Sequence, residues 1–131
     1  MTDDADNTSI PPAVGELLPR AAEAFGVRSK LATYSLDITN KVGAAKARGF
    51  ERILEITLED IDYLEAEILA GVLKTPIREI RGNAPYGVNC VVDIPIRGLG
   101  TKSERVLPVL TAWQIIEPGE APRLVTAYIK P

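Results

Sequence analysis

The 131-residue chain contains no histidine, and this absence narrows the chemistry that it can perform. A Ser-His-Asp triad, a Cys-His pair and a His-ligated metal are all excluded. Lysine, arginine, threonine and tyrosine remain, and the candidates among them come from two segments, one around Lys46 and one from Thr111 to Tyr128. Such side chains can stabilise a dianionic phosphorane and exchange protons with ribose and leaving-group oxygens. These residue types therefore indicate metal-independent transesterification of RNA as one candidate chemistry.

The candidate catalytic residues come from both segments and are Lys46, Thr111, Arg123, Thr126 and Tyr128. Arginine binds phosphate oxygens with two parallel hydrogen bonds, and aromatic rings stack single-stranded bases. We therefore expect Arg48 to bind substrate phosphate and Trp113 to serve as a stacking platform. No group of residues has the spacing of a metal site or of a phosphate-binding glycine loop, so no metal or cofactor is expected.

The register of the last two strands decides which side chains share a face. A hairpin across residues 117–122 that opposes Ile116 with Arg123 places Thr111 opposite Tyr128, and Trp113 opposite Thr126, on one exposed face. Asn89 and Asp93 are expected on that face, because the apolar residues of their strand point the other way. Arg123 falls on the opposite face, and its long side chain is expected to reach around the sheet edge. The competing interpretation is that these cross-strand pairs only stabilise the sheet.

The elements that must position these residues follow from a change in apolar spacing near Pro76. Helical spacing predicts helices over 29–37, 43–54 and 58–70, the last opened by a capping box from Thr57 to Asp60. Alternation then predicts strands over 77–81, 88–96, 105–116 and 123–130. Helices first and strands afterwards favour an α+β domain, with N-terminal helices packed on one face of an antiparallel sheet of about four strands.

Composition bounds the remaining possibilities. Residues 1–17 are expected to form a disordered acidic tail, and residues 18–131 a single domain. The single cysteine, Cys90, lies in the apolar set of its strand, so we expect a core thiol and no disulfide. No apolar run is long enough to span a membrane, and the N-terminus does not resemble a signal peptide. A cytoplasmic protein without membrane partners is therefore expected.

Charge is distributed unevenly along the chain. Residues 28–52 contain six basic and two acidic side chains, whereas residues 53–73 contain six acidic side chains and no basic one. The basic segment can meet a phosphate backbone, although a solvated helix face is the alternative reading of the same charges.

Several short motifs occur in a characteristic order, namely Leu18-Pro19-Arg20-Ala21, Lys30-Leu31-x-x-Tyr34-x-Leu36, Gly43-x-x-Lys46-Ala47-Arg48-x-Phe50, Tyr86-Gly87, Thr111-Ala112-Trp113 and Pro122-Arg123-Leu124-Val125-Thr126-Ala127-Tyr128. Over about residues 18–129 this set resembles the small bacterial family catalogued as domain of unknown function 6883. Related domains occur as free-standing bacterial and phage proteins and at the C-terminal tips of polymorphic and contact-dependent inhibition toxins.

The resemblance implies similarity to the barnase/EndoU/colicin/RelE group of ribonucleases, in which N-terminal helices precede a four-stranded antiparallel sheet. It adds Tyr86 to the expected substrate-binding residues. Family members often carry His-Pro shortly before the glycine that matches Gly43, where this chain has Asn40-Lys41. If that histidine were the catalytic base, this chain would be a weakened or inactive relative, but RelE-like relatives work with basic residues and no essential histidine.

Two functions are therefore carried forward. The first is a toxin-like, metal-independent endoribonuclease whose partners are RNA and a cognate immunity or antitoxin protein. The alternative is a non-catalytic binding module of the same fold, such as an accessory or immunity-like protein, that uses the same face for a protein partner.

Overall fold

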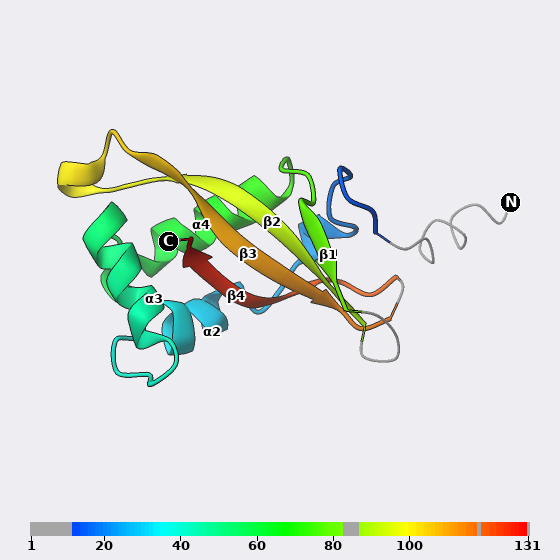
Figure 1. Ribbon diagram of the computed structural model, residues 1–131, viewed down its shortest axis with the longest axis horizontal. Coiled ribbons are helices and arrows are strands. Elements are labelled where there is room, and N and C mark those ends of the chain that lie inside the picture. The colour runs from blue at the N-terminus through cyan, green and yellow to red at the C-terminus, as the bar shows by residue number, and fades with distance from the viewer. Residues whose placement is uncertain (1–11, 83–86, 118, 131) are drawn as a thin grey trace, which may run out of the picture.

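A computed structural model describes residues 12–82, 87–117 and 119–130 of the chain. Its helices precede its strands, as the change of period predicts, and the fold class is α+β with a four-stranded antiparallel sheet in the C-terminal half (Figure 1). The α-helices are α2 (Val27–Lys30), α3 (Ala44–Gly49) and α4 (Ile61–Val72). The strands are β1 (Glu79–Arg81), β2 (Val88–Arg97), β3 (Val106–Ile115) and β4 (Arg123–Ile129).

Shorter helical turns extend these elements. Wider π-type turns continue α2 as η2 (Leu31–Ser35) and α3 as η3 (Phe50–Leu54), so each predicted helix is present as two joined pieces. The 3-10 turns are η1 (Ala21–Glu23), η4 (Leu58–Asp60) and η5 (Gly100–Lys102). The capping box is confirmed, because the Asp60 carboxylate accepts the backbone N–H of Thr57 at 2.9 Å where η4 leads into α4. η5 is the one helical turn that the structure describes after residue 75.

The strands follow one another in the sheet as β1-β2-β3-β4, and each neighbouring pair is antiparallel. Helix α4 contacts β2, whereas α2, η2 and α3 contact β4. The buried core lies between these helices and the sheet and includes alternate residues of β2 (Cys90, Val92, Ile94, Ile96). Gly71 lets α4 come close to the sheet, because a Cβ at this position would lie 2.2 Å from Cγ2 of Ile94.

The predicted register of β3 and β4 is wrong, by one residue up to Ala112 and by two residues beyond it. Thr111 lies opposite Ala127, and Tyr128 lies opposite Leu110. Because side chains alternate along a strand, this shift exchanges the two faces. Thr111 and Trp113 point toward the helices, and both are fully buried there. Leu110 and Ala112 share the other face with Tyr128.

A β-bulge in β4 changes the alternation once more. Ala112 pairs with Thr126 and Trp113 pairs with Leu124, so Val125 has no partner of its own across the ladder. Both Leu124 and Ala127 consequently belong to the core, although they are three residues apart. The same bulge places Arg123 on the face of Thr126 and Tyr128, which a regular strand would not do.

The face of the sheet that the helices do not cover is called the open face here. Its centre is formed by three buried apolar residues, Val91, Leu110 and Ala112, against which Tyr128 packs. Arg81, Asn89, Gln114 and Arg123 form a polar row across all four strands. The open face therefore combines an apolar centre with charged and polar side chains.

Two chain segments attach to the domain by backbone hydrogen bonds. Part of the predicted tail is among the described residues, where the Gly15 N–H donates to the Ile77 carbonyl at 2.8 Å and the Ile77 N–H donates to the Glu16 carbonyl at 2.8 Å. The tip of the β2–β3 hairpin lies beside the end of η3, where the Leu99 N–H donates to the Leu54 carbonyl at 2.8 Å (Figure 1). Within the described ranges, no helix is long and apolar enough to cross a membrane.

Candidate functional site

The strongest grouping of chemically active side chains lies where α3 and η2 meet β4. The Lys46 ammonium lies over two phenol rings, 4.4 Å from the ring centre of Tyr34 and 5.0 Å from that of Tyr128. It also donates a hydrogen bond to the Tyr34 hydroxyl. Lys30 approaches the same Tyr34 ring at 5.7 Å. We call Lys30, Tyr34, Lys46 and Tyr128 the Lys46 cluster.

The local sequence explains why Lys46 meets Tyr34. A Cβ at Gly43 would lie 2.1 Å from the Tyr34 carbonyl oxygen, so only glycine lets the start of α3 pack on this part of η2. The Asn40 side chain fixes the loop between them. Its Oδ1 accepts the backbone N–H groups of Val42 at 2.9 Å and Gly43 at 2.8 Å, and its Nδ2 donates to the Thr33 carbonyl at 3.0 Å. Asn40, at the position compared with the family's histidine, therefore has a structural role in this chain.

The open face continues from the Lys46 cluster along β4. Thr126 and Arg123 follow Tyr128 on this face, and Arg123 donates to the Gln114 side chain at 2.7 Å. The Thr126 hydroxyl is buried and has no hydrogen-bond partner among the described residues. Buried polar atoms are ordinarily satisfied, so an unpartnered one leaves a hydrogen bond that a further polar group can complete. Arg123 and Tyr128 are five residues apart, or roughly 16 Å at 3.3 Å per residue.

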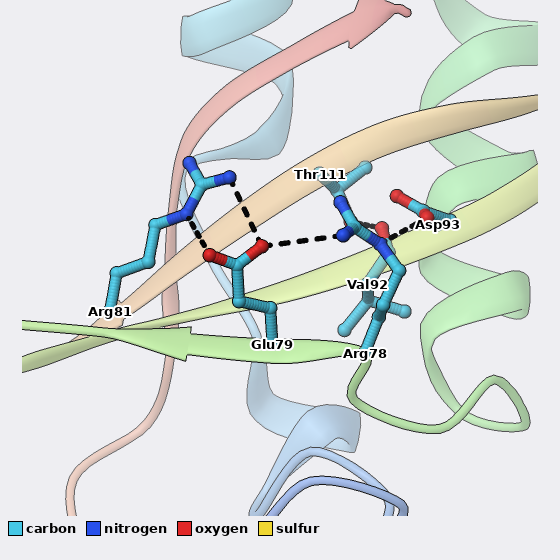
Figure 2. A network of polar contacts seen from close by, with 6 residues as sticks. All are labelled: Arg78, Glu79, Arg81, Val92, Asp93 and Thr111. Carbon is cyan, nitrogen blue, oxygen red and sulfur yellow. Dashed lines mark hydrogen bonds and ion pairs between the residues drawn. The ribbon is translucent and has the colours of Figure 1, made fainter.

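An ion-pair network occupies the other end of the open face, around β1. Figure 2 shows Arg78 between two carboxylates, with its Nε 2.5 Å from Oδ2 of Asp93 and its Nη1 3.3 Å from Oε1 of Glu79. Arg81 holds the same Glu79 through its Nε at 2.8 Å. The hydrogen bond from Arg81 lowers the pKa of Glu79, so this carboxylate stays charged at neutral pH. Oδ1 of Asp93 and Oδ1 of Asn89 are buried without a hydrogen-bond partner among the described residues.

Thr111 and Trp113 do not belong to this site. The Thr111 hydroxyl donates to the Val92 carbonyl at 2.6 Å and accepts the Trp113 indole N–H at 2.8 Å. This chain of hydrogen bonds satisfies two buried polar groups inside the core. Trp113 has no exposed surface and cannot stack a base, so the prediction of an exposed stacking platform is wrong.

The remaining predicted site residues differ in where the structure places them. Arg48 is exposed on α3 two positions after Lys46, and helix residues so spaced do not face each other, so it lies apart from the Lys46 cluster. Tyr86 lies outside the described residues. Asn89 and Asp93 lie on the face of Thr126 and Tyr128, as predicted, but without Thr111 and Trp113.

Sequence reasoning missed Tyr34 as a site residue. Two signals pointed to it: Lys30 and Tyr34 are four residues apart and so share a helix face, and Gly43 precedes Lys46 by three residues in an otherwise alanine-rich helix. Neither signal identifies Tyr128 as the second ring, because that contact joins residues far apart in the sequence.

No metal site accompanies the cluster, since no group of three or more Cys, Asp or Glu side chains among the described residues is arranged to hold an ion. Cys90 is buried in β2, as predicted, and burial raises the pKa of its thiol to about 11. Its thiol is therefore protonated at neutral pH and is a poor nucleophile.

Comparison with known proteins gives one match. No curated protein and no solved structure was found to match the chain. The sequence model of one family matches residues 17–131, which include every element from η1 to β4. The chain therefore belongs to the family described as "Domain of unknown function (DUF6883)".

Proposed function

We propose that this domain is a toxin-like, metal-independent endoribonuclease that cleaves RNA beside β4. The observation that carries the proposal is the Lys46 ammonium held over the rings of Tyr34 and Tyr128. It places a fixed positive charge and two phenols within one half-buried cluster. Preorganised donors of this kind stabilise developing negative charge better than water does.

The division of tasks follows from the hydrogen bonds. The Tyr34 hydroxyl accepts from Lys46, which leaves its own proton available for a substrate oxygen. In the proposed reaction the ribose 2′-hydroxyl gives its proton to a solvent water, its oxygen attacks phosphorus, and the bond to the 5′-oxygen breaks. Lys46 stabilises the charge on the phosphorane oxygens, and a phenol of the cluster protonates the leaving 5′-oxygen. The products are a 2′,3′-cyclic phosphate and a 5′-hydroxyl.

The rest of β4 supports binding of a longer strand. Arg123 is too far along the strand to share one phosphate with Tyr128, so it is assigned to a neighbouring phosphate of the same RNA. Thr126 lies between them, and its unpartnered hydroxyl suits a ribose or phosphate oxygen. The unpartnered acceptors of Asn89 and Asp93 suit donors on bases. Thr111, Trp113 and Arg48 have no part in this proposal.

The test is cleavage of total RNA by the purified full chain in the presence of a chelator. We expect fragments that end in 2′,3′-cyclic phosphate. Lys46→Met keeps most of the aliphatic stem and removes the charge, so it should lower the rate by about 100-fold, the scale of losing one preorganised charge stabiliser. Lys74→Met, just after α4, is the matched control and should cleave like the wild type.

Tyr128→Phe separates two roles of the ring. It keeps the surface that faces Lys46 and removes only the hydroxyl, so a loss of rate with unchanged RNA affinity would assign the proton transfer to Tyr128. Expression in cells should slow growth, and a cognate immunity protein should relieve this effect. If the protein is folded by circular dichroism and binds RNA but does not cleave it, the proposed ribonuclease activity is wrong. The non-catalytic binding module then remains as the function.

A further inference from the structure

We propose that a groove between η2, α3 and η4 binds a short basic segment of a partner protein, through apolar anchors and an acidic rim. This second surface lies apart from the Lys46 cluster, and the inference does not depend on the proposed ribonuclease activity.

The groove has a volume of about 630 Å³, within the range of sites that hold a few side chains of a ligand. Its lining includes Leu36 and Ala47, which are buried, and Ile38 and Leu58, which are 57% and 47% exposed. Because these two exposed side chains flank one hollow, a ligand in the groove can contact both, whereas apolar side chains scattered singly on a surface need no explanation.

The charge of the lining is one-sided. Asp37, Glu51 and Glu59 line the groove, and none of the lining residues is basic. Hydrogen bonds from Thr39 lower the pKa of Asp37, so this carboxylate remains ionised well below neutral pH. The lining therefore presents three acidic side chains around an apolar centre, which is complementary to a segment that carries both lysine or arginine and a bulky apolar residue.

The same charges argue against other occupants. RNA is a polyanion and would be repelled from this lining. The chain's own first residues contain Asp3, Asp4 and Asp6, so they do not match an acidic groove. An acidic immunity protein would likewise avoid the groove and would fit the basic side of α3 instead.

Helix α3 separates the two surfaces. Ala47 and Glu51 are four residues apart and face the groove, whereas Lys46 faces Tyr34 and Tyr128. One partner can therefore occupy the groove while RNA occupies the open face. This arrangement suits a carrier or targeting protein that recognises the domain without blocking its proposed site.

The experiment pans a phage library of random 12-residue peptides on the immobilised full chain. We expect the enriched peptides to combine two or more basic residues with a bulky apolar residue. A synthetic copy of an enriched peptide should lose at least 10-fold in affinity for Leu58→Ser and for Glu51→Lys/Glu59→Lys, measured by fluorescence anisotropy. Raising the salt concentration should weaken its binding to the wild type.

Matched controls use the same substitutions elsewhere. Leu73→Ser replaces another exposed leucine and Glu117→Lys another exposed acid, and both should bind the peptide like the wild type. If Glu59→Lys disturbs the start of α4, Glu59→Gln with Glu51→Gln repeats the test without added charge. RNA cleavage should be the same in all groove variants, which separates this inference from the proposed function.

Four outcomes would overturn the inference. The first two are that no peptide is enriched, or that the enriched peptides lack basic residues. The other two are that the groove variants bind the peptide with unchanged affinity, or that they lose RNA binding. Sedimentation velocity adds a fifth, because a dimer that Leu58→Ser dissociates would assign the groove to a second copy of this chain.

Discussion

Thr111 and Thr126 carry the same side chain on neighbouring strands, but the register gives them opposite surroundings. Thr111 faces the helices and links the Val92 carbonyl to the Trp113 indole. Thr126 faces away from the helices, and its buried hydroxyl has no partner among the described residues. The first hydroxyl therefore stabilises the fold, whereas the second makes no hydrogen bond that could do so.

Replacing each threonine by valine tests this difference. Thr111→Val leaves the Trp113 N–H without an acceptor in the core and should lower the free energy of unfolding by about 1–3 kcal/mol. Thr126→Val should leave it unchanged or raise it, by at most about 1–3 kcal/mol, because valine removes a buried hydroxyl that has no partner. Urea unfolding of both variants measures the difference.

The rate of RNA cleavage should respond to the two valine substitutions in the opposite way from stability. On the proposed function, Thr126→Val should slow RNA cleavage while Thr111→Val, assayed well below its melting temperature, should not. Equal losses of stability in the two variants would show that the faces of β3 and β4 are assigned wrongly.

At the scale of elements, two glycines in and before α3 have opposite structural meanings. Gly43 packs directly on the Tyr34 backbone, where a Cβ would lie 2.1 Å from the carbonyl oxygen. Gly49 lies within the helical segment, and a Cβ there would meet nothing within 4 Å. The first glycine permits a contact between elements, whereas the second only weakens the helix.

Alanine substitutions at the two positions should therefore change the free energy of unfolding in opposite directions. Gly43→Ala should destabilise the protein by about 1–3 kcal/mol, the range for a forced steric shift in a packed region. By separating α3 from η2, it should also reduce RNA cleavage like a milder Lys46 variant. Gly49→Ala should stabilise by about 0.5–1 kcal/mol, because alanine restricts the unfolded chain and favours the helix. A stabilising Gly43→Ala in chemical denaturation would contradict this packing.

At the scale of the whole molecule, Cys90 reports on the integrity of the core. It lies in β2, between the sheet and the helices, and is fully buried. Burial raises its pKa to about 11, so a reagent can reach a thiolate only when the core opens.

We expect alkylation of Cys90 by iodoacetamide at pH 8 to be slow in the native protein and fast in urea. Because the folded thiol holds its proton more tightly than an ordinary thiol with a pKa near 9, this group's contribution to stability is constant below about pH 9. That contribution should fall as the pH rises from about 9 to 11. Mass spectrometry of the alkylated fraction over time measures the opening, and rapid native labelling at pH 8 would contradict the burial.

The local sequence alone determined the elements of this protein. The helical spacing before Pro76, the alternation after it and the capping box at Thr57 each depend on residues close together in the chain, and all three predictions are confirmed. The burial of Cys90 follows in the same way from its place in an alternating strand. The candidate chemistry, without histidine, was likewise limited by composition alone.

Only the tertiary structure decided which side chains meet. The faces of β3 and β4 depend on a register that a single residue inverts, and on a bulge at Val125 that no local pattern marked. The Lys46 cluster joins η2, α3 and β4, whose contact depends on how a glycine packs on a distant backbone. Strand pairing and helix packing are set by the free energy of the whole core. The sequence therefore shows which chemical groups are present, but only the tertiary structure shows which of them lie close together.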